Sequence, residues 1–207
     1  RILGIVCSQR KEGNTEIMMR GALAQAEELG AETEMVLYAG KKILPCDACD
    51  TCLETGVCRI KDDMQPIYEQ MDRADGILFG TPVYLLNVSA QAKIIMDRTY
   101  ACLMTLRLAR KVVAPIVTAR RVGDGQVLSL MNSYFTVHGM VVAGFAGGYG
   151  SDKGEVREGP GMTPIFTALQ EARAAARSRA VSKRGRRSDR TNRWAMASSC
   201  KREGDSQ

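Results

Sequence analysis

The chain has 207 residues, of which 45% are hydrophobic and 25% charged, the proportions of an ordinary globular protein that can bury one full core. No stretch approaches the roughly 18 uninterrupted apolar residues of a membrane span, and the first residues lack a charged-then-apolar signal pattern, so we expect a cytoplasmic protein without a membrane partner. The net charge of +6 arises at the end of the chain, because residues 171–207 hold 11 Lys and Arg against 4 Asp and Glu, whereas residues 1–170 hold 18 against 19; the body therefore gives no indication of nucleic-acid binding.

Apolar runs of strand length alternate with longer segments of helical period. Strands rich in Val, Ile and Leu, buried on both faces, are predicted at residues 2–7, 34–38, 76–80, 112–118 and 140–145. Helices are predicted at residues 14–29, 63–71, 89–106, 127–137 and 164–177. Asn14 or Thr15 is a suitable cap for the first helix, and Gly30 ends it. The alternation predicts an α/β fold, a flavodoxin-like doubly wound five-stranded parallel sheet, with ligands at the carboxyl ends of its strands.

The loop after the first strand has the composition of a phosphate site. Ser8 and Arg10 precede a helix N-terminus, whose backbone amides attract anions, and Asn14 and Thr15 open that helix. The loop has neither the Gly-Lys-Ser/Thr of a Walker loop nor the dinucleotide glycine fingerprint, which favours a single phosphate. The alternative, a polar loop with a capped helix, leaves Ser8 and Arg10 unexplained.

The loop after the third strand places an apolar and aromatic wall beside backbone polar groups. Its residues are Thr81, Pro82, Val83, Tyr84 and, further on, Asn87. A planar ring system can stack on such a wall, whereas a turn stiffened by Pro82 explains the same residues without a ligand. The two loops together are more informative than either alone.

Taken in order, these motifs resemble the NADPH-dependent FMN reductase family of flavodoxin-like proteins, and within it the iron–sulfur flavoproteins. The likeness spans about residues 1–165 and is carried by Ser8-x-Arg10-x-x-x-Asn14-Thr15, Asp75-Gly76, Gly80-Thr81-Pro82-Val83-Tyr84, Ser89-Ala90-x-x-Lys93 and Asp97-Arg98. The chain departs from the family pattern at Cys7 and Gln9, where Gly and Pro are usual, and its third loop, residues 118–126, contains less Gly.

The resemblance implies FMN as a cofactor, with the chemistry carried by the flavin and by no catalytic side chain. By that resemblance the FMN phosphate would be held by Ser8, Arg10, Asn14 and Thr15. The isoalloxazine ring would be flanked by Thr81, Pro82, Val83 and Tyr84, with Asn87 and Ser89 as weaker candidates at the rim. Family members also dimerise through helices beside the flavin, which makes residues 89–106 a candidate interface of a homodimer or homotetramer.

Four of the seven cysteines follow the pattern Cys46-x2-Cys49-x2-Cys52-x5-Cys58, in a loop inserted into the fold. An odd total without an export signal argues against a disulfide framework. Thiolates at intervals of three residues can meet successive corners of one cubane, whereas structural zinc usually takes two cysteine pairs on distant segments. The spacing favours a 4Fe-4S cluster and resembles the motif of iron–sulfur flavoproteins. Cysteines that hold no cluster, or that bind zinc or sense redox state, are the alternatives.

The sequence thus predicts an FMN-dependent oxidoreductase that relays electrons between a 4Fe-4S cluster and FMN. A ferredoxin-like protein or NAD(P)H is the expected electron donor and a small molecule the acceptor. The alternatives are a NAD(P)H-dependent FMN or quinone reductase without a cluster, and a non-enzymatic interaction module on the same fold.

Two further features have interpretations without catalysis. His138, the only histidine, has no accompanying nucleophile motif and is predicted to be a core or surface residue. Residues 1–170 are expected to form the FMN-binding domain and residues 171–207 a basic, disordered tail. The part of the tail beyond about Arg177 is expected to be dispensable for cofactor binding and redox activity. Without apolar periodicity the tail cannot offset its ordering entropy by burial; attraction to RNA or a membrane surface is the alternative.

Overall fold

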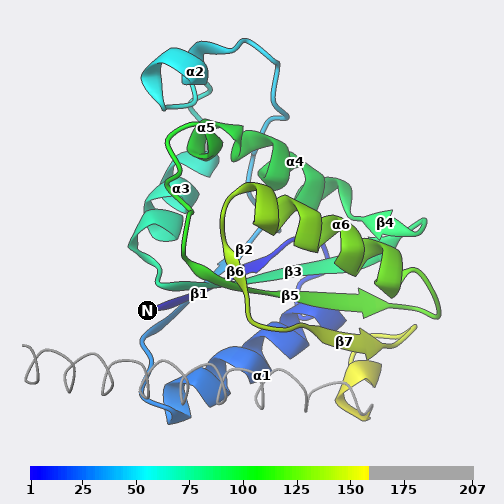
Figure 1. Cartoon of the computed structure of the whole chain (residues 1–207). Helices are drawn as coiled ribbons and strands as arrows, with labels where there is room; N and C mark the ends of the chain where they lie inside the picture. Colours follow the sequence, from blue (N-terminus) through cyan, green and yellow to red (C-terminus); the bar gives the residue numbers. More distant parts are fainter. Residues whose placement is uncertain (159–207) are drawn as a thin grey trace, which may run out of the picture. The chain divides into compact units, whose positions relative to one another are not determined.

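The computed structural model describes residues 1–158, which form a mostly parallel sheet covered by helices on both faces (Figure 1). The helix predicted at residues 164–177 and the predicted tail lie outside the described residues. Within the described part, no helix is long and apolar enough to cross a membrane.

The strands are β1 (Ile2–Val6), β2 (Thr33–Leu37), β3 (Gly76–Tyr84), β4 (Asn87–Val88), β5 (Val112–Ala119), β6 (Val141–Val142) and β7 (Ala146–Tyr149). Their order is β2-β1-β3-β5-β6, with β7 beside the far end of β5 and β4 folded back on β3 as an antiparallel hairpin. All pairings except that hairpin are parallel, so the chain crosses a face of the sheet between neighbouring strands. The predicted flavodoxin-like, doubly wound sheet is confirmed.

The edge strand is interrupted, whereas the sequence predicts one continuous strand over residues 140–145. Val112 pairs with Val141 but Ile116 pairs with Ala146, so one extra residue enters the edge strand between β6 and β7. The amides of Val141 and Ala143 donate to carbonyls of residues 111 and 113, so odd-numbered positions of β5 face the edge strand. The extra residue therefore lies beside Pro115. Because proline has no N–H to donate to the edge strand, the hydrogen-bond ladder is interrupted at this position, which favours a β-bulge.

The helices are α1 (Asn14–Glu28), α2 (Thr51–Thr55), α3 (Met64–Arg73), α4 (Ala90–Arg98), α5 (Tyr100–Leu103), α6 (Asp124–Val137) and the 3-10 turn η1 (Glu155–Glu158). Helix α1 lies on one face of the sheet, and α3, α4 and α6 lie on the other (Figure 1). Short α2 belongs to the loop that carries the four clustered cysteines, above α5 in that view.

Helix ends differ in part from the prediction. The N-cap of α1 is Gly13, so the expectation that Asn14 or Thr15 caps this helix is wrong, although Gly30 does follow its end with φ of 82°. The helix predicted over residues 89–106 is two helices, α4 and α5, and Ser89 caps the first of them by accepting a hydrogen bond from the Ala92 amide at 3.1 Å. Both caps place loop backbone at the carboxyl edge of the sheet.

Candidate functional site

A cavity of about 390 Å³ opens among the loops at the carboxyl ends of β1, β3, β5 and β7, and we call it the edge cavity. Seven of the ten residues predicted to bind the cofactor line it: Ser8, Arg10, Asn14, Thr15, Pro82, Val83 and Tyr84. The remaining three, Thr81, Asn87 and Ser89, do not line it. The sequence prediction missed other lining residues, among them Gly13, Thr118, Arg120, Gly150 and Lys153. These lie where strands end, and that position is the signal by which they can be found.

The N-terminus of α1 points into the edge cavity with its amides available. No side chain caps this helix, and Gly13 at the N-cap lines the cavity. The first N–H groups of a helix have no partner within the helix, and they carry its positive partial charge. The Arg10 side chain makes no hydrogen bond or ion pair within residues 1–158, while the Ser8 hydroxyl accepts from the Arg10 amide at 3.2 Å. The arrangement suits an anion.

The side chains of Asn14 and Thr15 are already engaged. The Asn14 amide group donates to the Asp152 carbonyl at 2.9 Å and accepts from the Gly154 amide at 2.8 Å. The Thr15 hydroxyl shares a 2.6 Å hydrogen bond with the Thr118 hydroxyl, and both side chains are buried. These residues tie loops far apart in the sequence to the start of α1, and they offer a ligand chiefly their backbone amides.

Thr81 and Ser89 form a buried polar network beneath the second loop. The Ser89 amide donates to the Thr81 hydroxyl at 3.1 Å, and the Ser89 hydroxyl donates to the Cys7 carbonyl at 2.7 Å. Both residues are 0% exposed. They hold the end of β3 against the start of α4 and the first loop, so that the neighbouring wall of the cavity keeps its position. Asn87 lies in the hairpin strand β4, where its side chain accepts from the Val88 amide at 2.8 Å.

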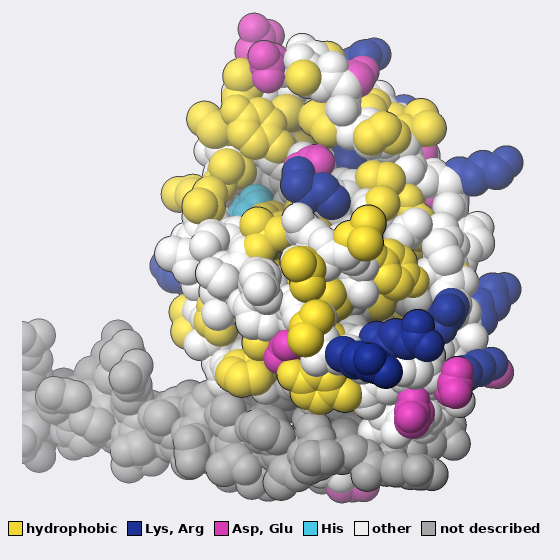
Figure 2. All heavy atoms as spheres, turned by 90° about the vertical axis from the view of Figure 1, so that its right-hand side faces the viewer, with side chains coloured by type: hydrophobic (Ala, Val, Ile, Leu, Met, Phe, Trp, Pro, Cys, Tyr) yellow, Lys and Arg dark blue, Asp and Glu magenta, His cyan; other side chains and the backbone are white. Residues whose placement is uncertain are grey.

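Two cationic side chains, Arg120 and Lys153, line the edge cavity where the loops after β5 and β7 form its rim. Arg120 donates to the Ser151 hydroxyl at 3.0 Å, and Lys153 forms an ion pair with Glu12 at 2.9 Å. The hydrogen bond from Lys153 is the main reason that the pKa of Glu12 is lowered. Figure 2 shows the carboxyl edge face, where Lys and Arg side chains gather beside a band of apolar side chains.

The apolar band includes a strained hairpin tip between β3 and β4. Leu85 and Leu86 both have positive φ, 47° and 62°, in a two-residue turn where Asn-Gly is the common choice. Leu85 is 100% exposed and Tyr84 47% exposed. Leu86 rests on Gly123, at which a Cβ would come within 3.1 Å of it. Bulky residues in this conformation cost energy, and such strain is concentrated at functional sites.

A second cavity, of about 580 Å³, lies between the cysteine loop (residues 46–58) and helices α4, α5 and α6, and we call it the cysteine cavity. All four clustered cysteines line it, with Cys46 and Cys49 exposed and Cys52 and Cys58 half-buried. In residues 1–158 no three Cys, His, Asp or Glu side chains already stand together in a metal-binding arrangement. The fold thus brings the four thiols to one cavity without bringing them to one point.

The cysteine thiols differ in their electrostatic surroundings. A hydrogen bond involving Thr51 lowers the pKa of Cys49, whereas burial raises that of Cys52. Cys102 is a buried thiol outside the loop, and burial raises its pKa to about 11. Deprotonated thiols are the metal ligands, so Cys49, whose pKa is lowered, is better suited to metal binding than the buried Cys102.

His138 lies at the wall of the cysteine cavity and is buried, as the sequence analysis allows for a core residue. The Thr99 hydroxyl donates to the Met96 carbonyl at 2.7 Å, so it accepts from both Tyr134, at 2.7 Å, and His138 Nε2, at 3.2 Å. This assigns the proton of the neutral ring to Nε2. Burial lowers the pKa of His138, which keeps the ring neutral.

Comparison with known proteins agrees with this architecture. A family model described as NADPH-dependent FMN reductase matches residues 1–151. An iron–sulfur flavoprotein from Methanocaldococcus jannaschii is 38% identical over 146 residues, which cover 70% of this chain and 76% of that protein. One from Methanosarcina thermophila is 37% identical over 147 residues, covering 70% and 77% of the two chains.

Two solved structures support the fold alone. The Trp repressor binding protein from Bacillus subtilis has a TM-score of 0.61 at 19% identity, over 81% of this chain and 99% of that one. A WrbA-like flavodoxin from Agrobacterium tumefaciens has a TM-score of 0.56 at 15% identity, over 85% and 96%.

Proposed function

We propose that this chain, which belongs to the NADPH-dependent FMN reductase family and within it to the iron–sulfur flavoproteins, relays electrons between FMN and a 4Fe-4S cluster. Family membership makes it an FMN-dependent oxidoreductase. The proposal goes further in assigning FMN to the edge cavity and the cluster to the cysteine cavity. The observation that carries it is the presence of both cavities, each with fitting donor groups, in one domain.

The FMN phosphate is assigned to the start of α1. A phosphate requires hydrogen-bond donors and positive charge, and the uncapped first turn supplies both. The Arg10 guanidinium, which has no partner within residues 1–158, adds a full charge, and the Ser8 hydroxyl adds a further polar group. Asn14 and Thr15 contribute through their amides while their side chains hold the surrounding loops.

The flavin ring is assigned to the wall formed by Pro82, Val83 and Tyr84. When bound, the flavin accepts and returns electrons as hydride or singly. The chain needs no acid or base of its own for this chemistry, and its residues orient the ring and exclude water from one side. The exposed Leu85 and Leu86 extend the apolar wall outward, where an electron acceptor or donor must approach.

The cluster is assigned to Cys46, Cys49, Cys52 and Cys58, which all line the cysteine cavity. Soft thiolates select iron–sulfur clusters or zinc over hard cations. The loop is exposed, with positive φ at Ala48 and Asp50, and its thiols would gather when the cluster binds. The cluster supplies single-electron transfer when bound.

The partners follow from the two redox groups. A ferredoxin-like protein that delivers single electrons suits the cluster, whereas NAD(P)H suits direct hydride transfer to FMN, and a small molecule is the terminal acceptor. A homodimer or homotetramer is expected through residues 89–106, where Tyr100, Met104 and Leu106 are exposed apolar side chains.

Anaerobic purification tests the cofactor assignment. The protein should be yellow and should contain about four iron and four sulfide per chain, the stoichiometry of one four-cysteine cubane. A colourless protein that takes up no added FMN contradicts the flavin assignment, and zinc in place of iron contradicts the cluster.

Reduction by separate donors tests the relay. Rapid mixing with reduced ferredoxin should bleach the flavin absorption faster than mixing with NADPH. The reverse order, in protein that contains its cluster, contradicts the relay.

A reductase without a cluster is the second candidate function. One observation favours it: no preformed metal-binding group of three side chains exists within residues 1–158. It predicts a yellow, iron-free protein under strict anaerobiosis, reduced directly by NAD(P)H.

A further inference from the structure

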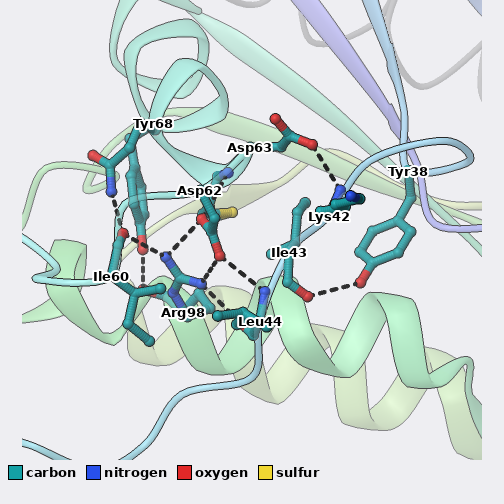
Figure 3. A network of polar contacts seen from close by, with 11 residues as sticks. Tyr38, Lys42, Ile43, Leu44, Ile60, Asp62, Asp63, Tyr68 and Arg98 are labelled. Atoms are coloured by element: carbon teal, nitrogen blue, oxygen red, sulfur yellow. Dashed lines mark hydrogen bonds and ion pairs between the residues drawn. The ribbon is translucent and has the colours of Figure 1, made fainter.

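Both ends of the cysteine loop meet one buried ion pair of the domain. Leu44 precedes the first cysteine by two residues, and Ile60 follows the last by two. Both ends meet the side chains of Asp62 and Arg98, as Figure 3 shows. Arg98 is the last residue of α4, so the base of the loop is fixed by a helix that belongs to the core.

The Arg98 guanidinium binds both ends of the loop at once. Nη1 donates to the Leu44 carbonyl at 2.7 Å and Nη2 to the Ile60 carbonyl at 3.2 Å. The same two nitrogens hold the Asp62 carboxylate in a fork, at 2.7 and 3.1 Å. Asp62 in turn accepts from the Leu44 amide at 2.8 Å. A planar group with five fixed N–H donors is suited to this geometry, and the point charge of a lysine is not.

The ion pair lies in the interior. The Arg98 side chain is 0% exposed and that of Asp62 8%. Burial alone raises the pKa of the Asp62 carboxyl, but hydrogen bonds from Arg98 and from the Leu44 and Met64 amides outweigh it and lower the pKa. Both groups are therefore charged, and each depends on the other for compensation.

One N–H of Arg98 is left over. Four of its five N–H groups are taken by the carbonyls and the carboxylate, and the fifth, on Nε, is buried with no partner within residues 1–158. A buried cationic donor without an acceptor is rare and requires an explanation. Arg98 also lines the cysteine cavity, together with all four loop cysteines.

We propose that Arg98 is a positioning residue for the cysteine loop, holding both of its ends at one point and placing its charge and its remaining N–H at the wall of the cavity that the four thiols share. The inference rests on the proposed cluster. A loop closed at its base loses less conformational entropy when its cysteines gather on a ligand. A positive charge and a hydrogen bond near the sulfurs favour the reduced, more negative cluster, and so raise its reduction potential.

The test compares two double variants and one single variant of the full chain. Arg98→Met with Asp62→Asn removes both buried charges together, so that neither is left unpaired. The control is Arg107→Met with Asp72→Asn, because Arg107 also holds a carboxylate in a fork but does not line the cysteine cavity. Arg98→Lys retains the charge and loses the fork.

Three quantities are measured on each anaerobically reconstituted protein: iron retained against a chelator, FMN retained, and the reduction potential of the cluster. The first double variant should lose iron at least severalfold faster than wild type and keep its FMN. The two charges that it removes cancel, so a more negative potential in this variant reports the lost N–H donor and not a lost net charge. The control should match wild type in all three. Arg98→Lys should lose iron faster with a smaller shift in potential.

The outcomes separate the two proposals. Wild type that holds no iron after reconstitution overturns the cluster and this inference together. Wild type that holds iron, with unchanged retention and potential in the first double variant, overturns the inference alone. If the first double variant loses iron and FMN together at an unchanged potential, Arg98 contributes only to the general stability of the domain. That result also overturns the inference.

Discussion

The edge cavity and the cysteine cavity are built in opposite ways. The edge cavity is formed at the ends of core strands, and the groups proposed to bind an anion there are mostly backbone amides at a helix start. The ligands proposed for a cluster in the cysteine cavity are side chains, carried by a loop whose residues are mainly exposed. Hydrogen bonds hold that loop at both of its ends. A backbone site is complete when the fold is complete, whereas a side-chain site on a loop is completed by its ligand.

The difference has a consequence for mutation. Substitutions in the cysteine loop should abolish binding of the cluster and leave FMN binding and the sheet intact, because the two cavities share no lining residue. Single substitutions at the edge cavity should weaken FMN binding without abolishing it, because the backbone amides remain when a side chain is removed.

The largest effect is expected from Cys52→Ala, which removes one of the proposed cluster ligands. Most of the iron should be lost, while FMN is retained. Iron, sulfide and flavin per chain are the measured quantities. Cys102→Ala is the control, since that thiol is buried outside the loop and should leave iron unchanged. Equal iron loss in both variants would contradict the assignment.

Arg10→Ala should weaken FMN binding by about 10- to 100-fold, because a hydrogen bond to a charged group contributes about 1.5–3 kcal/mol and each 1.4 kcal/mol is tenfold in Kd. Fluorescence quenching of free FMN measures the Kd. Lys11→Ala removes the same charge from the neighbouring residue, which does not line the edge cavity, and should have a much smaller effect. Similar Kd values for the two variants would argue against a specific contact.

His138 should make the stability of the domain sensitive to mild acid. Burial lowers its pKa in the folded state, so between that value and about 6.5 the unfolded chain binds the extra proton. The free energy of unfolding therefore falls as pH falls below about 6.5, by about 1.4 kcal/mol for each unit of pKa depression. Denaturant unfolding at several pH values tests this, and His138→Gln should flatten the dependence. An unchanged slope in that variant would show that another group titrates.

The smallest effect concerns the hairpin tip beside the edge cavity. Leu85→Asn should raise the free energy of unfolding by about 1 kcal/mol, because Asn tolerates a left-handed backbone that costs other residues roughly 1–2 kcal/mol. Leu85 is fully exposed, so no packing is lost. Val122→Asn, at another exposed apolar position, is the control and should change little. A loss of stability at Leu85 would mean that the turn is not strained.

Tertiary structure decided the roles of individual polar residues. Asn14 and Thr15 are read from the sequence as ligand groups, yet their side chains bond to Asp152 and Thr118, more than a hundred residues away. Ser89 is one residue among several at a predicted rim, and only folding shows it as a buried cap. A hydrogen-bond partner is chosen by the whole chain, so local pattern cannot supply it.

The sequence by itself determined the alternation of strands and helices, the parallel sheet, the loops at its carboxyl edge and the spacing of the four cysteines. These are local properties, set by apolar periodicity and by residues a few positions apart. The bulge beside Pro115, the fork of Arg98 on Asp62 and the shared cavity of the four thiols depend on which distant segments pack together. Packing is cooperative over the whole domain, and so only the tertiary structure fixed them.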